Sequence, residues 1–135
     1  MGENRQKIMY QCAQATIKSE ELKMTDKQIN TYFGETANYS DPDAFASDVA
    51  LSLLDPEDPD QKVDMDLAEQ LRVLWHVARD TYKDFFRLLG LTQTQVSIRF
   101  CIPLRTVQRW AAEDNTPPLY VRLMMAEAAG ILHIR

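Results

Sequence analysis

Residues 91–110 read LTQTQVSIRFCIPLRTVQRW, and this segment decides the fold of the chain around it. It holds three arginines and no acidic residue, although the whole 135-residue chain has a formal net charge of −5. Thr92 is a typical helix N-cap, which predicts a helix over about residues 93–100. Pro103 has no N–H to lose at a helix start, so a second helix is expected from there to about Ala112. The sequence therefore predicts two short helices joined by a tight turn.

The apolar residues of this segment fall at offsets that would join the two helices. Val96 and Phe100 are four apart, on one face of the first helix. Val107 and Trp110 are three apart on the second helix, and Ile102 follows the turn. We expect these side chains to be buried and to fix the angle at which the helices cross. Two such helices form a helix-turn-helix unit.

Helical spacing of apolar residues continues through most of the chain, with polar or proline starts and glycine stops. The expected helices cover about residues 4–23, 26–34, 42–54, 66–79, 82–90, 93–100, 103–112 and 117–129. No alternation of the β type is present, so the predicted fold class is all-α. The segment DPEDPDQ, residues 55–61, is acidic and proline-broken and is expected to be a linker. It divides a helical accessory region, residues 1–60, from a helix-turn-helix domain, residues 61–135.

Charge differs between the two halves. Residues 1–65 hold thirteen acidic and six basic residues, a net charge of −7, whereas residues 66–135 hold seven acidic and nine basic residues, a net charge of +2. An acidic total argues against indiscriminate coating of nucleic acid, but it leaves room for a local basic surface. The halves therefore have different roles in this interpretation.

Several classes of protein are disfavoured. No run approaches the roughly 18 apolar residues of a membrane-spanning helix, and the start of the chain lacks the apolar core of a secretory signal. Cys12 and Cys101 are too few for a disulfide framework, so a cytoplasmic location is expected, with Cys101 a small buried residue. His76 and His133 are not part of any set of Cys, Asp or Glu residues at the spacing of metal ligands, and the sequence contains no catalytic motif. Neither a cofactor nor an enzymatic activity is expected.

Residues 81–130 resemble the DNA-binding domain of phage repressor and Cro-type proteins, the XRE family of bacterial regulators. The matching features are LTQTQVSIRF as supporting helix, IPLRTVQRW as recognition helix and TPPLYVRLMMAEAAGI as closing helix. Several independent residue offsets agree with the family pattern, so the whole pattern is more specific than any one of these helices. The resemblance implies a cytoplasmic, repressor-like regulator of transcription that binds double-stranded DNA as a dimer on a pseudo-palindromic operator. It covers about fifty residues and none of residues 1–65.

Four residues of the second helix are candidates for reading bases in the major groove. Arg105 and Arg109, one turn apart, share the face opposite Val107 and could each bind a guanine edge. Leu104 could touch a thymine methyl group, and Gln108 could reach a base or a phosphate.

Phosphate contacts are expected beside them. The resemblance places two at Thr92 and Gln93, where N–H groups at a helix start also suit an anion. Arg99 and Thr106 are further candidates for phosphate contact. A carboxylate in this segment would lie against phosphate, which explains why residues 91–110 contain none.

Two departures from the family pattern bear on this interpretation. Many relatives have glycine at the turn position of Cys101, where a positive φ is convenient. Glu113 and Asp114 follow the recognition helix, where family members often have small or basic residues, and would weaken binding of a monomer. The alternative is a helical protein-interaction adaptor that keeps the fold without reading DNA.

The ends of the chain leave further alternatives open. Residues 1–60 could serve dimerisation, capture a protein partner, or mask the basic surface of residues 91–110 by competing for it. Leu132 and Ile134 could form a dimer contact or fold back on the N-terminal helices.

Overall fold

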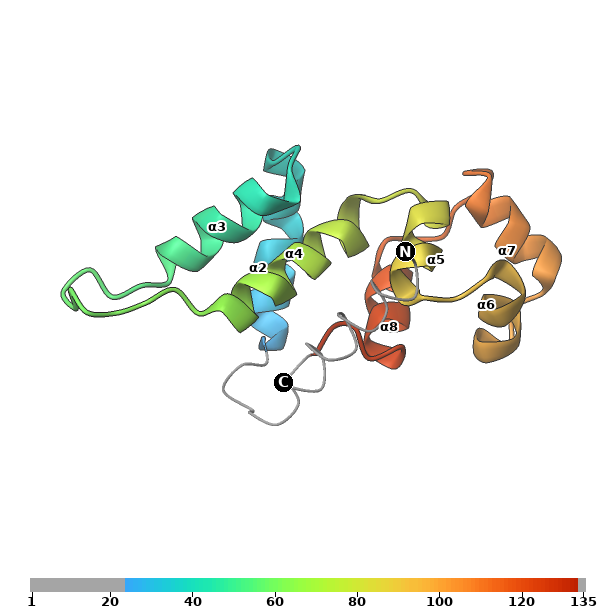
Figure 1. The fold of residues 1–135 in the computed structure, drawn as a ribbon. Helices are drawn as coiled ribbons and strands as arrows, with labels where there is room; N and C mark the ends of the chain where they lie inside the picture. Colours follow the sequence, from blue (N-terminus) through green and yellow to red (C-terminus); the bar gives the residue numbers. More distant parts are fainter. Residues whose placement is uncertain (1–23, 134–135) are drawn as a thin grey trace.

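The computed structural model describes residues 24–133, so the expected helix over residues 4–23 and the side chain of Ile134 lie outside the described residues. Within that range the chain is all-helical, without a β-strand, as predicted. The elements are α2 (Asp26–Glu35), the 3-10 turn η2 (Thr36–Asn38), α3 (Pro42–Ser52), α4 (Met65–Arg79), α5 (Tyr82–Leu89), α6 (Gln93–Phe100), α7 (Leu104–Ala111) and α8 (Tyr120–Ala128). Figure 1 shows α2 and α3 toward one end, α6 and α7 at the other, and α4 running between them.

Most helix starts are set by the local side chains that the sequence indicated. The Thr25 hydroxyl accepts a hydrogen bond from the Gln28 N–H at 3.2 Å, and the Gln28 side-chain oxygen accepts one from the Thr25 N–H at 2.9 Å. At α3 the Asp41 carboxylate accepts the Ala44 N–H at 3.0 Å, with Pro42 as the first helical residue. The start predicted at Pro117-Pro118 differs, because α8 begins only at Tyr120.

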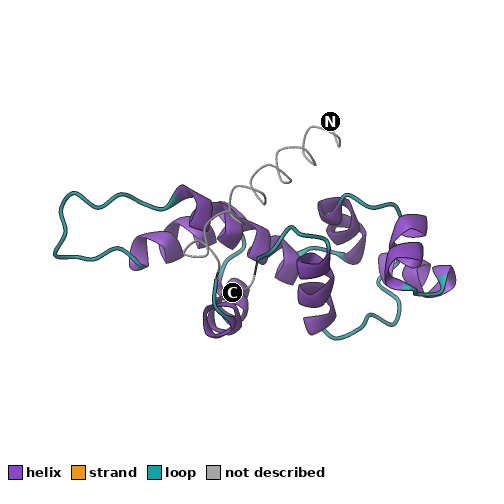
Figure 2. Cartoon of the chain, turned by 90° about the horizontal axis from the view of Figure 1, so that it is seen from below, coloured by secondary structure: helices purple, strands orange, loops and turns teal. Residues whose placement is uncertain are grey.

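The helices α3 and α4 pack along one another and are joined by the acidic segment at residues 55–61, which Figure 2 shows as a long loop. Phe45 of α3 is fully buried and meets the Tyr39 ring edge-on at 5.5 Å between centroids. The Trp75 indole N–H of α4 donates to the Tyr39 carbonyl oxygen at 3.1 Å. A single cluster of buried side chains runs from Met24 to Leu132. Residue 60, the predicted boundary, thus lies in a loop between two helices that share one core.

Arg122 of α8 is a buried cation that joins three helices. Its guanidinium donates to the carbonyl oxygens of Val77, at 3.3 Å, and Asp80, at the C-terminal end of α4. The same group lies over the Tyr82 ring of α5, 4.1 Å from the ring centroid. A positive charge is favourable at the C-terminal end of a helix, where the last carbonyl groups lack helical partners. Arg122 therefore fixes α8 to the junction of α4 and α5.

The end of the described chain returns to α4. Leu132 is fully buried, and the His133 backbone N–H donates to the Gln70 side-chain oxygen at 3.1 Å. Leu132 is buried in the protein's own core, which agrees with folding back and not with a dimer contact, but the hydrogen bond beside it reaches α4 and not one of the N-terminal helices that were expected.

The prediction that Cys101 is a small buried residue is wrong, because its side chain is exposed. The residue is the C-cap of α6 and adopts the left-handed conformation, with φ at 55°. Cys101 thus adopts the positive φ that many relatives of the resembled family reach with glycine at this turn.

Cys101→Gly is therefore expected to raise the free energy of unfolding by about 1 kcal/mol, because glycine adopts this conformation without the steric cost that a β-carbon adds. Chemical denaturation of the two proteins measures the difference. Cys101→Ala serves as the control, since it removes the thiol and keeps the β-carbon, and it should leave stability almost unchanged.

Candidate nucleic-acid interface

The turn between α6 and α7 is held by hydrogen bonds from both directions. The Ile102 N–H donates to the Ser97 carbonyl oxygen at 3.0 Å, and the Ser97 hydroxyl donates to the Ile102 carbonyl oxygen at 2.6 Å. Val96 of α6 and Val107 of α7 are fully buried, as predicted. These hydrogen bonds and the two buried valines fix the position of α7 relative to α6. A helix that contacts a ligand needs such a fixed position.

Three other predicted core residues are only half-buried, because they lie at the rim of this small core: Phe100, Ile102 and Trp110. The Trp110 ring packs against Tyr82 at 5.8 Å between centroids, which ties α7 to α5. Burial raises the pKa of the Tyr82 phenol and Glu113 adds to the shift, whereas Arg122 opposes it. Tyr82 thus stays a neutral packing residue in the physiological range.

The outer face of α7 presents all four residues predicted to read bases. Arg105, Gln108 and Arg109 are exposed, and Leu104 is exposed at 39%. Within residues 24–133, neither arginine side chain makes a hydrogen bond or an ion pair with another residue. Two guanidinium groups one helical turn apart are therefore available to a ligand on this face.

Three of the four residues predicted to bind phosphate lie at the starts of α6 and α7. Thr92 caps α6, accepting the Gln95 N–H at 3.1 Å, and its exposed hydroxyl keeps a proton to donate. Gln93 follows as the first residue of α6 and is half-buried, and Thr106 is half-buried in the first turn of α7. These three residues lie at the starts of the two helices that the turn joins.

Arg99 differs from the other candidates, because its guanidinium is engaged within the protein. It donates to the Ala128 carbonyl oxygen at 2.7 Å, at the C-terminal end of α8. That bond supplies a partner for an unpaired helix-end carbonyl, as cations near helix ends do. We therefore leave Arg99 out of the proposed contacts with phosphate.

Glu113 was expected to oppose phosphate, and the structure gives it another partner. Its carboxylate accepts the Tyr82 N–H at 2.7 Å, which places a negative charge at the N-terminus of α5. Glu113 and Asn115 both adopt positive φ, at 58°, and this bends the segment after α7 back toward α5. A carboxylate at a helix N-terminus is favourable, so its charge is partly balanced there.

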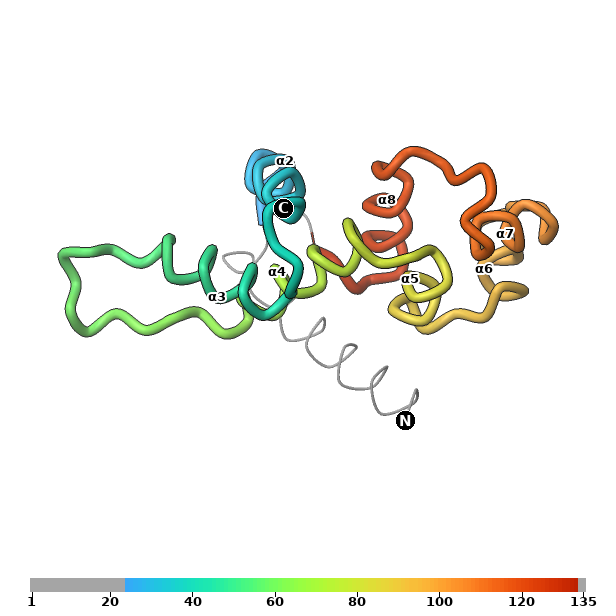
Figure 3. Tube along the Cα trace, turned by 90° about the horizontal axis from the view of Figure 1, so that it is seen from above, coloured from blue at the N-terminus to red at the C-terminus, as the bar shows by residue number. Residues whose placement is uncertain are grey.

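The acidic elements of the described chain lie away from α7. In Figures 1 and 3, α2 and α3 lie at the far end of α4 from α6 and α7. The outer face of α7 is thus not covered by α2, η2 or α3. Masking by these elements would need a different arrangement from the one seen.

Comparisons with protein families, with curated proteins and with solved structures find no match to this chain. Among residues 24–133, no group of three or more His, Cys, Asp or Glu side chains could hold a metal ion. No helix in that range has both the length and the apolar character needed to cross a membrane.

Proposed function

We propose that this chain is a sequence-specific DNA-binding regulator of transcription that reads the major groove with α7. The observation that carries the proposal is the exposed pair Arg105 and Arg109 on a helix whose opposite face is anchored by fully buried Val107. Arginine binding both guanine acceptors is the commonest specific contact in the major groove. Neither arginine needs to break an internal ion pair with the described residues to make it.

The proposal includes a homodimer on a pseudo-palindromic operator. Eight-residue helices read few base pairs, so two copies spaced by one turn of DNA, about 34 Å, supply the length of a useful site. Exposed apolar side chains at α8 offer a surface for such an assembly: Leu119, Tyr120 and Met124.

Binding to duplex DNA across a range of salt concentrations tests the proposal. Because phosphate contacts release counterions, log K should fall linearly with log salt, by about 0.9 for each phosphate neutralised. A preference for one sequence should persist on top of this dependence. Absence of duplex binding at low salt, with any sequence, would overturn the proposal.

A second candidate function is a protein-interaction adaptor, and it has one specific observation in its favour. The end of the α3–α4 pair exposes apolar side chains, with Leu51 at 54%, Leu53 at 42% and Met65 at 71%. Scattered exposed apolar residues are normal, but neighbouring ones favour contact with another protein. The adaptor would leave Arg105 and Arg109 without a role, so the salt series on duplex DNA separates the two functions.

A further inference from the structure

The loop that joins α3 to α4, together with the adjoining helix ends, forms a tip, residues 51–66, that is both apolar and acidic. Leu51, Leu53 and Met65 are exposed there. The tip has six acidic residues and one basic residue, a net charge of −5. All six acidic residues are exposed: Asp55, Glu57, Asp58, Asp60, Asp64 and Asp66. Large apolar side chains gathered on a surface favour contact with another protein, and this surface needs a partner that carries positive charge.

The opposite end of the molecule carries the opposite charge. Residues 91–110 have a net charge of +3 and no acidic residue. Arg105 and Arg109 are exposed on the outer face of α7, and Leu104 on the same face is an exposed apolar residue. Ile98 of α6 is exposed as well. This end of the chain therefore combines positive charge with exposed apolar side chains, as a partner of the tip must.

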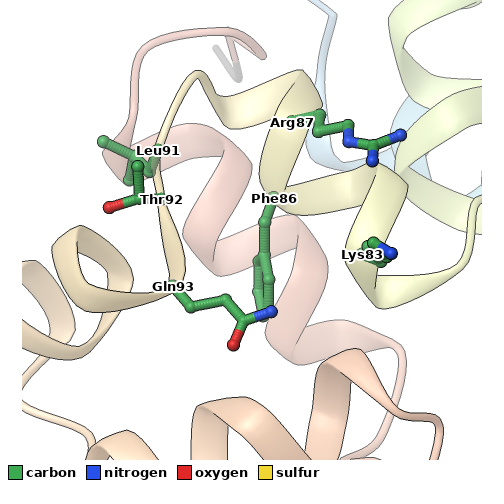
Figure 4. Close-up of a pocket in the computed structure, with 6 residues that line it drawn as sticks. All are labelled: Lys83, Phe86, Arg87, Leu91, Thr92 and Gln93. Atoms are coloured by element: carbon green, nitrogen blue, oxygen red, sulfur yellow. The ribbon is translucent and has the colours of Figure 1, made fainter.

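Other arginines near α6 already have partners within the protein. Arg99 donates to the Ala128 carbonyl oxygen at 2.7 Å. Arg87 of α5 pairs with Asp84 at 3.3 Å, and Figure 4 shows its side chain turned away from Gln93 at the start of α6. The arginine pair of α7 is thus the part of this surface that can meet a carboxylate without giving up a contact with the described residues.

The tip does not reach α7 of its own copy. In Figures 1 and 3 the tip and α7 lie at opposite ends of the described chain, with α4 between them. Leu71, Leu74 and Val77 of α4 are fully buried in the core that the helices share, so α4 holds the two ends apart. A contact between the tip and α7 therefore has to join two copies.

We propose that the tip of one copy docks on the outer face of α7 of a second copy. The arginine pair faces the tip carboxylates, and Leu104 meets the apolar side chains of the tip. Contact between like ends is disfavoured, because it would bring two acidic tips or two arginine pairs together. Because the two surfaces differ, the contact is head-to-tail, and it can build open chains or closed rings.

The contact regulates access to DNA. This consequence rests on the proposed function, because it takes α7 as the reading helix. The same guanidinium groups cannot bind guanine and a carboxylate of the tip at once, so copies held head-to-tail are withheld from DNA. The apparent Kd for DNA rises in inverse proportion to the fraction of copies whose α7 is free, so forming the contact in half of them raises it roughly twofold.

Sedimentation of the full-length protein without DNA tests the contact. The average mass of the parent should rise with protein concentration at about 50 mM salt, and this rise should shrink at about 500 mM salt, because salt screens charge pairs at a surface. Arg105→Ala/Arg109→Ala should lose this salt-sensitive rise. Glu57→Lys/Asp60→Lys should lose it too, since it reverses two tip charges that make no side-chain hydrogen bond within residues 24–133.

Mixing the two double variants separates a contact between unlike ends from general charge effects. One variant keeps an intact α7 and the other keeps an intact tip, so an equimolar mixture should regain part of the rise that each has lost. Leu51→Ala/Met65→Ala, which leaves every charge in place, should reduce the rise because it removes apolar contacts. Asp26→Lys/Glu35→Lys is the matched control, because it makes the same change of charge at exposed positions on α2, and it should associate as the parent does.

Duplex binding then tests the consequence for DNA. At a concentration at which half of the contacts form in the parent, Glu57→Lys/Asp60→Lys should bind duplex DNA roughly twofold more tightly than the equally charged α2 control. A parent of constant mass at low salt, a mixture no heavier than its two components, or an unchanged rise in Leu51→Ala/Met65→Ala would overturn the contact. These results contain no DNA and would leave the proposed function standing. Absence of duplex binding would overturn the proposed function and the regulation, but not the contact.

Discussion

Arg105→Ala and Arg109→Ala are each expected to weaken binding to the preferred DNA sequence by about 1–3 kcal/mol, which is roughly 5- to 150-fold in Kd. Each arginine is exposed on the outer face of α7, where its removal takes away the proposed guanine contact and leaves the buried Val107 side untouched. Each variant should also relax the preference at one base position, and the two positions should differ. Kd values against the preferred duplex and its single-base variants measure both effects.

Lys62→Ala is the matched control, because it removes one exposed positive charge from the α3–α4 loop. It should change neither the preferred sequence nor the affinity for it by more than about twofold, since long-range charge effects are screened by salt. If both arginine variants discriminate among duplexes as the parent does, α7 does not present the reading face.

Phe45→Ala is expected to lower the free energy of unfolding by about 3–5 kcal/mol, because it leaves a cavity at a fully buried aromatic position. The loss should reach the helix-turn-helix, since the buried cluster that contains Phe45 extends through α4 to α8. Trp110 can report on that region when Trp75 is replaced by phenylalanine. Denaturation followed by Trp110 fluorescence, with and without Phe45→Ala on this background, measures the effect.

Leu51→Ala on the same background is the control. Leu51 lies on the same helix but is 54% exposed, so its removal should change stability by less than about 0.5 kcal/mol. If the Trp110 transition stays in place when Phe45 is replaced, residues 1–60 and 61–135 fold independently, as the sequence-based division at residue 60 predicts. If it moves, deletion of residues 1–60 would destabilise the helix-turn-helix as well and could not report on masking alone.

Local signals in the sequence were sufficient for the fold class and for most helix boundaries. Thr25, Asp41 and Thr92 cap their helices with the side-chain contacts expected of them, and Gly90 ends α5 with φ at 76°. These features depend on residues three or four apart, so they can be predicted from a single sequence. The exposure of the α7 outer face also followed from spacing, since Val107 fixes which side is buried.

Contacts between distant residues were not predictable in the same way. Nothing near Glu113 in the sequence indicates that its carboxylate accepts the Tyr82 N–H, 31 positions away. Arg99 has the same type of side chain as Arg105, yet it reaches the Ala128 carbonyl only because the fold brings the C-terminal end of α8 within hydrogen-bond distance. The packing of α3 on α4 was missed because the acidic segment at residues 55–61 has the composition of a linker. The composition of a loop indicates its exposure to solvent, but it does not show whether the helices on either side of the loop pack together.

Selection of binding sites from a pool of random duplex DNA, carried out in parallel with the purified parent and with Arg105→Ala/Arg109→Ala, tests the central claim most directly. The parent should enrich a pseudo-palindromic sequence whose half-sites are about 34 Å apart. The double variant should lose that enrichment while keeping its salt-dependent affinity for duplex DNA. Enrichment of no sequence by the parent, or of the same sequence by both proteins, would contradict the assignment of α7 as the reading helix.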